Sequence, residues 1–183
     1  MKILRWKINE IFYSIQGEGH NTGLPFVFVR FSGCNLKCDF CDTMQESYKF
    51  WKIADIINEV KKYPCKNVVL TGGEPSIYDL EPIVKELKKF DYYIAIETNG
   101  TGKIPDGIDF VTVSPKTADF LKKGNELKLV YKGQDLRDYE NLDFHFFYLQ
   151  PCSNKNVIET YNAVLANPKW RLSLQIHKLI GVR

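Results

Sequence analysis

Short apolar runs rich in β-branched and aromatic residues recur along the chain, and turn-forming residues bound most of them. Runs of this kind are typical of β-strands. We predict six strands and a seventh, weaker one, over Phe26–Phe31, Asn67–Thr71, Tyr93–Glu97, Phe110–Ser114, Glu126–Val130, Phe146–Gln150 and Arg171–Gln175.

Between several of these runs, apolar residues return at the spacing of an α-helix. We therefore predict helices over Trp51–Lys62, Asp79–Phe90 and Val157–Asn167. Strands that alternate with helices indicate βαβ units and a parallel sheet. The chain has 183 residues, whereas a complete (β/α)8 barrel takes about 250. The pattern thus predicts an α/β fold in a single domain over 1–183, either a partial barrel or a doubly wound sheet.

Polar motifs end or directly follow four of the predicted strands. In open α/β sheets and barrels, ligands bind at the carboxyl ends of the strands. We therefore expect one active site at this edge, formed by Thr71-Gly72-Gly73-Glu74-Pro75, Glu97-Thr98-Asn99-Gly100, Ser114-Pro115-Lys116 and Gln150-Pro151.

Composition narrows the class of protein. Hydrophobic residues make up 44% and charged residues 26% of the chain, as in an ordinary globular protein. A net charge of +3 is too small to indicate nucleic-acid binding. The sequence contains neither an apolar run of about 18 residues nor a signal-peptide opening. We expect a cytoplasmic enzyme or binding domain that associates with neither nucleic acid nor a membrane.

The cysteines suggest specific chemistry. There are five, and three of them form the pattern Cys34-x3-Cys38-x2-Cys41. An odd count without a secretory signal disfavours a disulfide framework. Thiolates this close repel one another unless a metal centre neutralises them. Structural zinc usually takes four ligands, and a second CxxC pair is missing from the sequence. Three thiolates can instead hold three corners of a [4Fe–4S] cluster and leave one iron open.

Two motifs resemble the radical S-adenosylmethionine (SAM) superfamily: Cys34-x3-Cys38-x-Phe40-Cys41 and Gly72-Gly73-Glu74-Pro75. The resemblance implies a [4Fe–4S] cluster on Cys34, Cys38 and Cys41. It further implies that SAM binds the open iron and is cleaved to a 5′-deoxyadenosyl radical. An external electron donor such as flavodoxin or ferredoxin is then expected. Because the radical comes from SAM and the cluster, we expect no side chain to be a catalytic residue.

Further segments resemble the 7-carboxy-7-deazaguanine synthase (QueE) family. They are Glu10–Gly19, Phe28–Cys34, Cys41–Thr43, Gly124–Lys128 and Trp170–Lys178. The resemblance implies conversion of 6-carboxy-5,6,7,8-tetrahydropterin to 7-carboxy-7-deazaguanine with loss of ammonia, in queuosine and 7-deazapurine biosynthesis. It also implies Mg²⁺, regenerated SAM, a homodimer, and a shortened (β/α)6-type barrel of six parallel strands with a radical SAM core.

The same resemblance assigns site residues by position. Substrate binding falls to Ile15, Gln16, Gly17, Glu18, Arg30, Thr71, His177 and, if it is the true end, Arg183. Mg²⁺ binding falls to Thr43. The SAM site is expected to comprise Phe40, Cys41, Asp42, Gly73, Glu74, Ser114, Pro115, Lys116, Gln150, Pro151, Cys152 and Ser153.

Several of these residues have plainer interpretations. Arg30 lies inside an apolar run and fits a structural ion pair as well as an anionic substrate. Thr43 suits a helix cap, His177 suits a packed histidine at the end of a strand, and Cys65 suits a small buried residue. The aromatic run Phe144–Tyr148 suits either a dimer contact or a pocket wall.

Two alternative functions stay open at this point. One is a radical-activating enzyme that acts on a protein partner. The other is a zinc-stabilised binding module without enzymatic activity. Zinc without iron or sulfide in anaerobically purified protein would favour the second.

Overall fold

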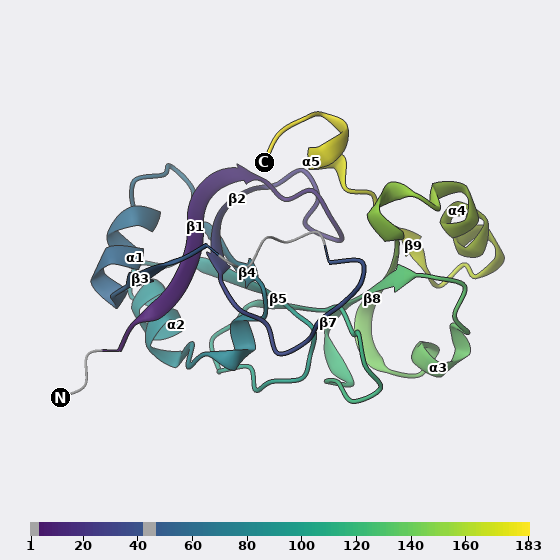
Figure 1. Ribbon diagram of the computed structural model, residues 1–183, viewed down its shortest axis with the longest axis horizontal. Helices are drawn as coiled ribbons and strands as arrows, with labels where there is room; N and C mark the ends of the chain where they lie inside the picture. The colour runs from purple at the N-terminus through teal and green to yellow at the C-terminus, as the bar shows by residue number, and fades with distance from the viewer. Residues whose placement is uncertain (1–3, 42–46) are drawn as a thin grey trace.

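The computed structural model describes residues 4–41 and 47–183 and contains a curved sheet of nine strands (Figure 1). The strand order is β3-β1-β2-β4-β5-β6-β7-β8-β9. The strands are β1 (Trp6–Ile15), β2 (Pro25–Phe31), β3 (Lys49–Trp51), β4 (Asn67–Gly72), β5 (Tyr93–Thr98), β6 (Phe110–Val113), β7 (Lys123–Tyr131), β8 (Asp143–Pro151) and β9 (Arg171–Leu172).

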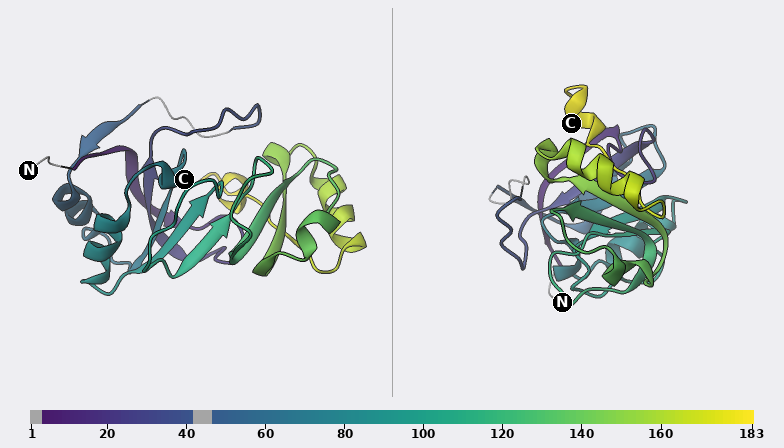
Figure 2. Two further views of the ribbon diagram at one scale, coloured as in Figure 1. Left: turned by 90° about the horizontal axis from the view of Figure 1, so that it is seen from below. Right: turned by 90° about the vertical axis from the view of Figure 1, so that its right-hand side faces the viewer.

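The helices flank this sheet in two groups. Figure 2 shows α1 and α2 near one end of the sheet and α3 and α4 near the other. The α-helices are α1 (Ile53–Val60), α2 (Glu81–Lys88), α3 (Arg137–Glu140), α4 (Val157–Ala166) and α5 (Ile176–Leu179), and Pro75–Ile77 and Cys152–Asn154 form 3-10 turns. None of the described helices is long and apolar enough to cross a membrane.

Strands β2, β4, β5, β6, β7 and β8 follow one another in the sheet and pair in parallel, and the two-residue strand β9 adds a seventh parallel strand beside β8. The prediction of a shortened, partial barrel of parallel strands is therefore confirmed, with β9 at the position of the seventh, weaker predicted strand. Helices α1, α2 and α4 lie within the three predicted helical segments. The connections from β5 to β6 and from β6 to β7 contain no helix, which shortens the chain relative to a full barrel.

Strand β1 was not predicted from the pattern, and its irregularity explains why. It pairs antiparallel with β2, and its register shifts between Ile8 and Glu10. Trp6 and Ile8 pack in the core under the helices, whereas Phe12 packs on the opposite face. The extra residue of a bulge moves all following side chains to the opposite face of the sheet. The alternation of apolar and polar residues is therefore interrupted within this strand.

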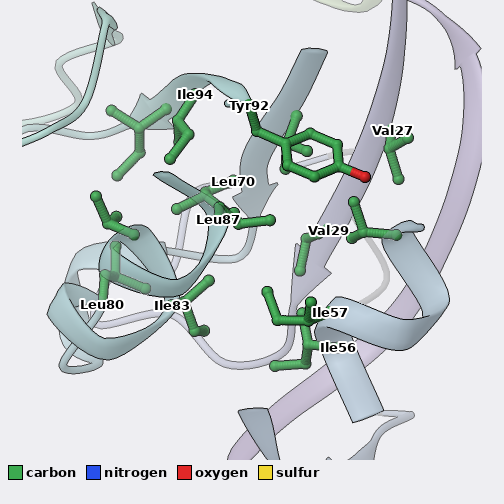
Figure 3. Packing of buried hydrophobic residues seen from close by; sticks show 14 of the residues in the cluster. Val27, Val29, Ile56, Ile57, Leu70, Leu80, Ile83, Leu87, Tyr92 and Ile94 are labelled. Atoms are coloured by element: carbon green, nitrogen blue, oxygen red, sulfur yellow. The ribbon is translucent and has the colours of Figure 1, made fainter. Parts of the chain in front are cut away.

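The outer face of the parallel strands is apolar. Val27 and Val29 of β2 point toward α1 and α2, whose buried residues complete this core (Figure 3). A second cluster between β7, β8 and α4 includes Phe144, Phe147 and Trp170. These two phenylalanines, like Tyr148, are buried within the chain itself, so they are not available as a dimer contact.

The inner face is divided along its length. At the amino ends of the strands it carries an apolar cluster that includes Phe28, Val69, Ala95 and Phe110. Side chains alternate between the two faces of a strand, so positions two residues further along lie on the same inner face. At these positions the residues are polar. These inner polar residues line a cavity at the carboxyl ends, and they include Arg30, Thr71, Glu97, Lys128 and Gln150.

Candidate active site at the carboxyl ends of the strands

A cavity of about 310 Å³ opens at the carboxyl ends of the parallel strands, within the range that holds small-molecule ligands. It brings together most of the predicted site residues: Ile15, Gln16, Gly17, Glu18, Arg30, Cys34, Cys38, Phe40, Cys41, Thr71, Gly73, Glu74, Ser114, Lys116, Gln150, Pro151, Ser153, His177 and Arg183. Pro115 and Cys152 are not among the described residues that line it. Asp42 and Thr43 lie outside the described residues.

The cysteine loop starts three residues after β2 and forms one wall of this cavity. Cys34, Cys38 and Cys41 all line it. A tight turn joins the last two, because the Cys41 amide donates to the carbonyl of Cys38 at 3.0 Å. Burial, together with the charges of Glu74, Cys38 and Cys41, raises the pKa of the Cys34 thiol. A cationic centre is therefore needed to stabilise the thiolate form of these cysteines.

This donor set fits an iron–sulfur cluster better than zinc. Among the described residues, no three of His, Cys, Asp and Glu surround a single point closely enough for one metal ion. A [4Fe–4S] cluster spreads its thiolate ligands over separate iron atoms, and three cysteines on one loop suit that arrangement. A structural zinc ion needs four donors at one point.

Gly72 and Gly73 fix the base of the cysteine loop. The amide of Gly73 donates to Phe31 at 3.0 Å, and that of Glu74 donates to Gly33 at 2.9 Å. A Cβ at either glycine would overlap the backbone of Phe31 or Gly33. The two glycines therefore allow the segment before Cys34 to approach closely, and the contact of Gly73 with SAM stays a prediction.

The side chain of Glu74 is fully buried, and its carboxylate accepts hydrogen bonds from other residues of the protein. One carboxylate oxygen accepts from Thr98 Oγ1 at 2.6 Å and from Ser76, and the other accepts from the Asn99 amide at 2.6 Å. Asn99 Nδ2 in turn donates to Asn35 Oδ1 at 3.1 Å, in the cysteine loop. Glu74 thus ties together the loops that follow β2, β4 and β5. Its contact with SAM stays a prediction.

Glu18 and Lys128, which also line the cavity, form a buried ion pair. Lys128 Nζ lies 2.6 Å from Glu18 Oε2, and Gln175 Nε2 donates to Glu18 Oε1 at 2.6 Å. Burial acts to raise the pKa of Glu18, but Lys128 and Gln175 outweigh it, so that pKa is lowered. Burial acts to lower the pKa of Lys128, but the carboxylates of Glu18, Glu97 and Glu126 outweigh it and raise that pKa. Both side chains are therefore charged.

Glu97 also lines the cavity and belongs to the same network. Its carboxylate accepts from Gln16 Nε2 at 3.0 Å and from Thr71 Oγ1 at 2.7 Å, and it lies 3.8 Å from Lys128 Nζ. Glu97 belongs to one of the four motifs that were predicted to form the site, and it lines the cavity. Neither it nor Lys128 or Gln175 was assigned a role from sequence. For Lys128, the available signal was a charged residue within an otherwise apolar strand.

Arg30 lies at the mouth of the cavity in a cluster of charges. Its Nε is 2.9 Å from Glu10 Oε1, and the same carboxylate pairs with Arg183. Both guanidinium groups lie over the ring of Phe12, at 5.5 and 5.1 Å. Arg30 is thus both an ion-pair partner and a cavity-lining residue, so the two interpretations from sequence are compatible.

The carboxyl-terminal segment closes the cavity on the side of the Gln16–Gly19 loop. The Ile176 amide donates to the carbonyl of Gly17 at 3.0 Å. The imidazole of His177 packs against Gly17 so closely that a Cβ there would overlap it. His177 lies in helix α5, not at the end of a strand as expected, because β9 ends at Leu172.

Two lysines flank Phe40 beside the cysteines. Lys132 Nζ lies 3.6 Å and Lys116 Nζ 5.4 Å from the centroid of its ring. Lys116 Nζ also donates to Ser114 Oγ at 2.9 Å. Cys65, which has no part in the site, is buried as predicted, with its thiol 3.1 Å from the carbonyl of Pro25.

Comparison with known proteins agrees with this geometry. Residues 28–161 match the Radical SAM superfamily. The chain is 53% identical to a 7-carboxy-7-deazaguanine synthase of Bacteroides thetaiotaomicron, over 97% of this chain and 98% of that protein. It is 39% identical to the enzyme of that name from Haemophilus influenzae, over 97% and 94% of the two chains.

A solved structure gives the same result at the level of the fold. The crystal structure of QueE from Escherichia coli is similar to this chain with a TM-score of 0.80 and 28% identity, over 93% of this chain and 94% of that one. The family match shows a radical SAM enzyme, and the three cysteines line the cavity described above. The chain belongs to the 7-carboxy-7-deazaguanine synthase family of the radical SAM superfamily.

Proposed function

We propose that this protein converts 6-carboxy-5,6,7,8-tetrahydropterin to 7-carboxy-7-deazaguanine and ammonia, in the biosynthesis of queuosine and related 7-deazapurines. The observation that carries the proposal is one cavity with two unlike walls. The cysteine loop forms one wall, and the buried polar network of Glu18, Glu97 and Lys128 forms the other. A cavity of about 310 Å³ suits a small molecule better than a protein substrate, and this disfavours a radical-activating enzyme.

Cys34, Cys38 and Cys41 would hold the [4Fe–4S] cluster and leave one iron for SAM. When bound, the reduced cluster and SAM supply a radical that abstracts hydrogen from the substrate. The surrounding residues exclude water and orient the two ligands. Phe40 lies beside Lys116 and lines the cavity together with the cysteines, and Ser114, Gln150 and Ser153 add polar atoms to its lining.

The opposite wall suits a pterin. The pterin has a guanidine-like edge of N–H donors. Carboxylates such as Glu18 and Glu97 can accept hydrogen bonds from these donors. Each carboxylate oxygen has two acceptor sites, so the hydrogen bonds that these groups already make leave capacity for the ligand. Lys128 keeps Glu18 ionised, and the charge strengthens hydrogen bonds to the substrate.

The 6-carboxylate of the substrate needs cationic partners. Arg30 lies at the mouth of the cavity, where its guanidinium can pair with a carboxylate in the bidentate fashion that a lysine lacks. Mg²⁺ would be a second partner, bound by Thr43 and substrate oxygens. Thr43 lies outside the described residues, so the Mg²⁺ proposal rests on the resemblance alone.

The remaining elements of the proposal also rest on the family. We infer a single-domain cytoplasmic enzyme that forms a homodimer and takes its electron from a donor such as flavodoxin or ferredoxin. Sedimentation at several protein concentrations tests the dimer, and a monomer throughout would reject it.

The substitution Arg30→Ala tests the proposed substrate site. We expect turnover of the carboxypterin to be lost while iron, sulfide and slow formation of 5′-deoxyadenosine from SAM are retained. Arg5→Ala is a matched control, because Arg5 is exposed and does not line the cavity. Unchanged kinetics in Arg30→Ala would reject the role of Arg30.

A further inference from the structure

Strand β7 places two charged side chains on its inner face, two residues apart. Lys128 lines the cavity, whereas Glu126 lies deeper and is 2% exposed. Burying a carboxylate is costly unless it is paired or hydrogen-bonded. The proposed chemistry assigns no role to Glu126, so its contacts indicate what it does.

The Glu126 carboxylate lies directly against the backbone of Gly19 and His20. Its Oε2 accepts from the His20 amide at 2.6 Å. Gly19 has a φ of +66°, and a Cβ there would overlap the Glu126 carboxylate. Both the glycine and its left-handed conformation are therefore matched to the carboxylate beneath them.

These two residues directly follow Gln16, Gly17 and Glu18, the loop that forms the pterin wall of the cavity. The same strand holds that loop at a second point, because Lys128 pairs with Glu18. A third attachment comes from Ser173, whose Oγ accepts from the Gly19 amide at 2.9 Å. The loop is thus fastened by its backbone at Gly19 and His20 and by its side chain at Glu18.

We propose that Glu126 is a positioning residue for substrate binding: it fixes the Gly19–His20 backbone so that Gln16 and Glu18 face the cavity before the substrate arrives. A preorganised loop loses less conformational entropy when the ligand binds. The inference rests on the proposed function for the identity of the substrate, but not for the contact between Glu126 and the loop.

The test compares Glu126→Ala and Glu126→Gln in the reconstituted holoenzyme. Loss of a charge-assisted hydrogen bond corresponds to about a tenfold change in affinity. We expect KM for the carboxypterin to rise about tenfold in Glu126→Ala, with a smaller change in kcat. Glu126→Gln keeps an acceptor for His20, so its KM should rise less.

Asp109→Ala is the matched control. Asp109 also accepts from a backbone amide, that of Ile94 at 2.7 Å, but it does not line the cavity or contact the loop. We expect its KM to equal that of the wild type.

Hydrogen–deuterium exchange without substrate gives a readout that does not depend on turnover. We expect the amides of residues 16–20 to exchange faster in Glu126→Ala, and the amides of the β4 and β5 strands to be unaffected. Unchanged exchange in this loop, or faster exchange throughout the protein, would overturn the proposal. If the wild type fails to turn over the carboxypterin, the proposed function falls, but the exchange result still decides the role of Glu126.

Discussion

Lys128 and Glu18 are 110 residues apart in the chain, yet Lys128 Nζ lies 2.6 Å from Glu18 Oε2 in the interior of the partial barrel. The side chains are only 6% and 15% exposed. Glu97 and Glu126 also face this ammonium group. One buried cation therefore holds together three carboxylates from three separate segments.

Replacing that cation should destabilise the fold. Lys128→Met leaves buried carboxylates without their partner, and breaking a buried pair in this way costs about 3–5 kcal/mol. We expect a loss of that order in the free energy of unfolding, measured by urea denaturation at pH 8. The loss should shrink at pH 5, where the buried carboxylates are more easily protonated.

Lys123→Met is the control for this prediction, because Lys123 is on the same strand but exposed. Surface substitutions usually stay within about 0.5 kcal/mol. Equal effects of the two substitutions would show that the buried network does not stabilise the protein.

A second prediction concerns pH. Burial raises the pKa of Glu126 to about 7 from an ordinary value of 4.5, despite the opposing effect of Lys128. Between these values the folded state binds more protons than the unfolded state, so this group's contribution to stability is present at low pH and is lost as pH rises toward 7. The other groups that act on Glu126 are Glu97, which raises its pKa, and Thr112 and the His20 amide, which lower it.

Glu126→Gln should remove this dependence. Relative to the wild type, the variant should gain roughly 2–3 kcal/mol of stability between pH 5 and pH 8. Urea denaturation of both proteins across this range checks the difference. Parallel pH profiles would contradict it. A variant that gains stability while its KM rises would also show that the fold accepts a cost at Glu126 for substrate binding.

A third prediction concerns assembly of the cluster. Gly72 has a φ of +120°, and a Cβ there would overlap the backbone of Phe31. Gly72→Ala should displace the segment before Cys34 and lower the iron and sulfide content after anaerobic reconstitution. Gly23→Ala is the control, since Gly23 also has a positive φ but an open surrounding. Equal iron content in both variants would contradict the link between Gly72 and the cysteine loop.

The sequence predicted the parallel core because each of its strands is a compact apolar run with a turn or polar motif at its end. It predicted the cysteine wall because three thiols in eight residues are a strong local signal. The antiparallel strand β1 escaped prediction because its bulge breaks the alternation between Trp6 and Phe12. The last predicted strand is short because Ser173 and Gln175 bind the Gly19 amide and Glu18.

The polar network was the part of the site hardest to predict. Glu97 and Lys128 are single charged residues in apolar strands, and their meaning depends on which residues face them across the barrel. Those partners are distant in sequence: Gln16 and Thr71 for Glu97, and Glu18 for Lys128. Only the three-dimensional arrangement shows that these charged residues form one network in the cavity.

Anaerobic turnover of the reconstituted protein with SAM, a reductant, Mg²⁺ and 6-carboxy-5,6,7,8-tetrahydropterin tests the central claim most directly. We predict that mass spectrometry will detect 7-carboxy-7-deazaguanine at many equivalents per SAM, because the proposed reaction regenerates SAM. Slow formation of 5′-deoxyadenosine without this product would contradict the proposed substrate.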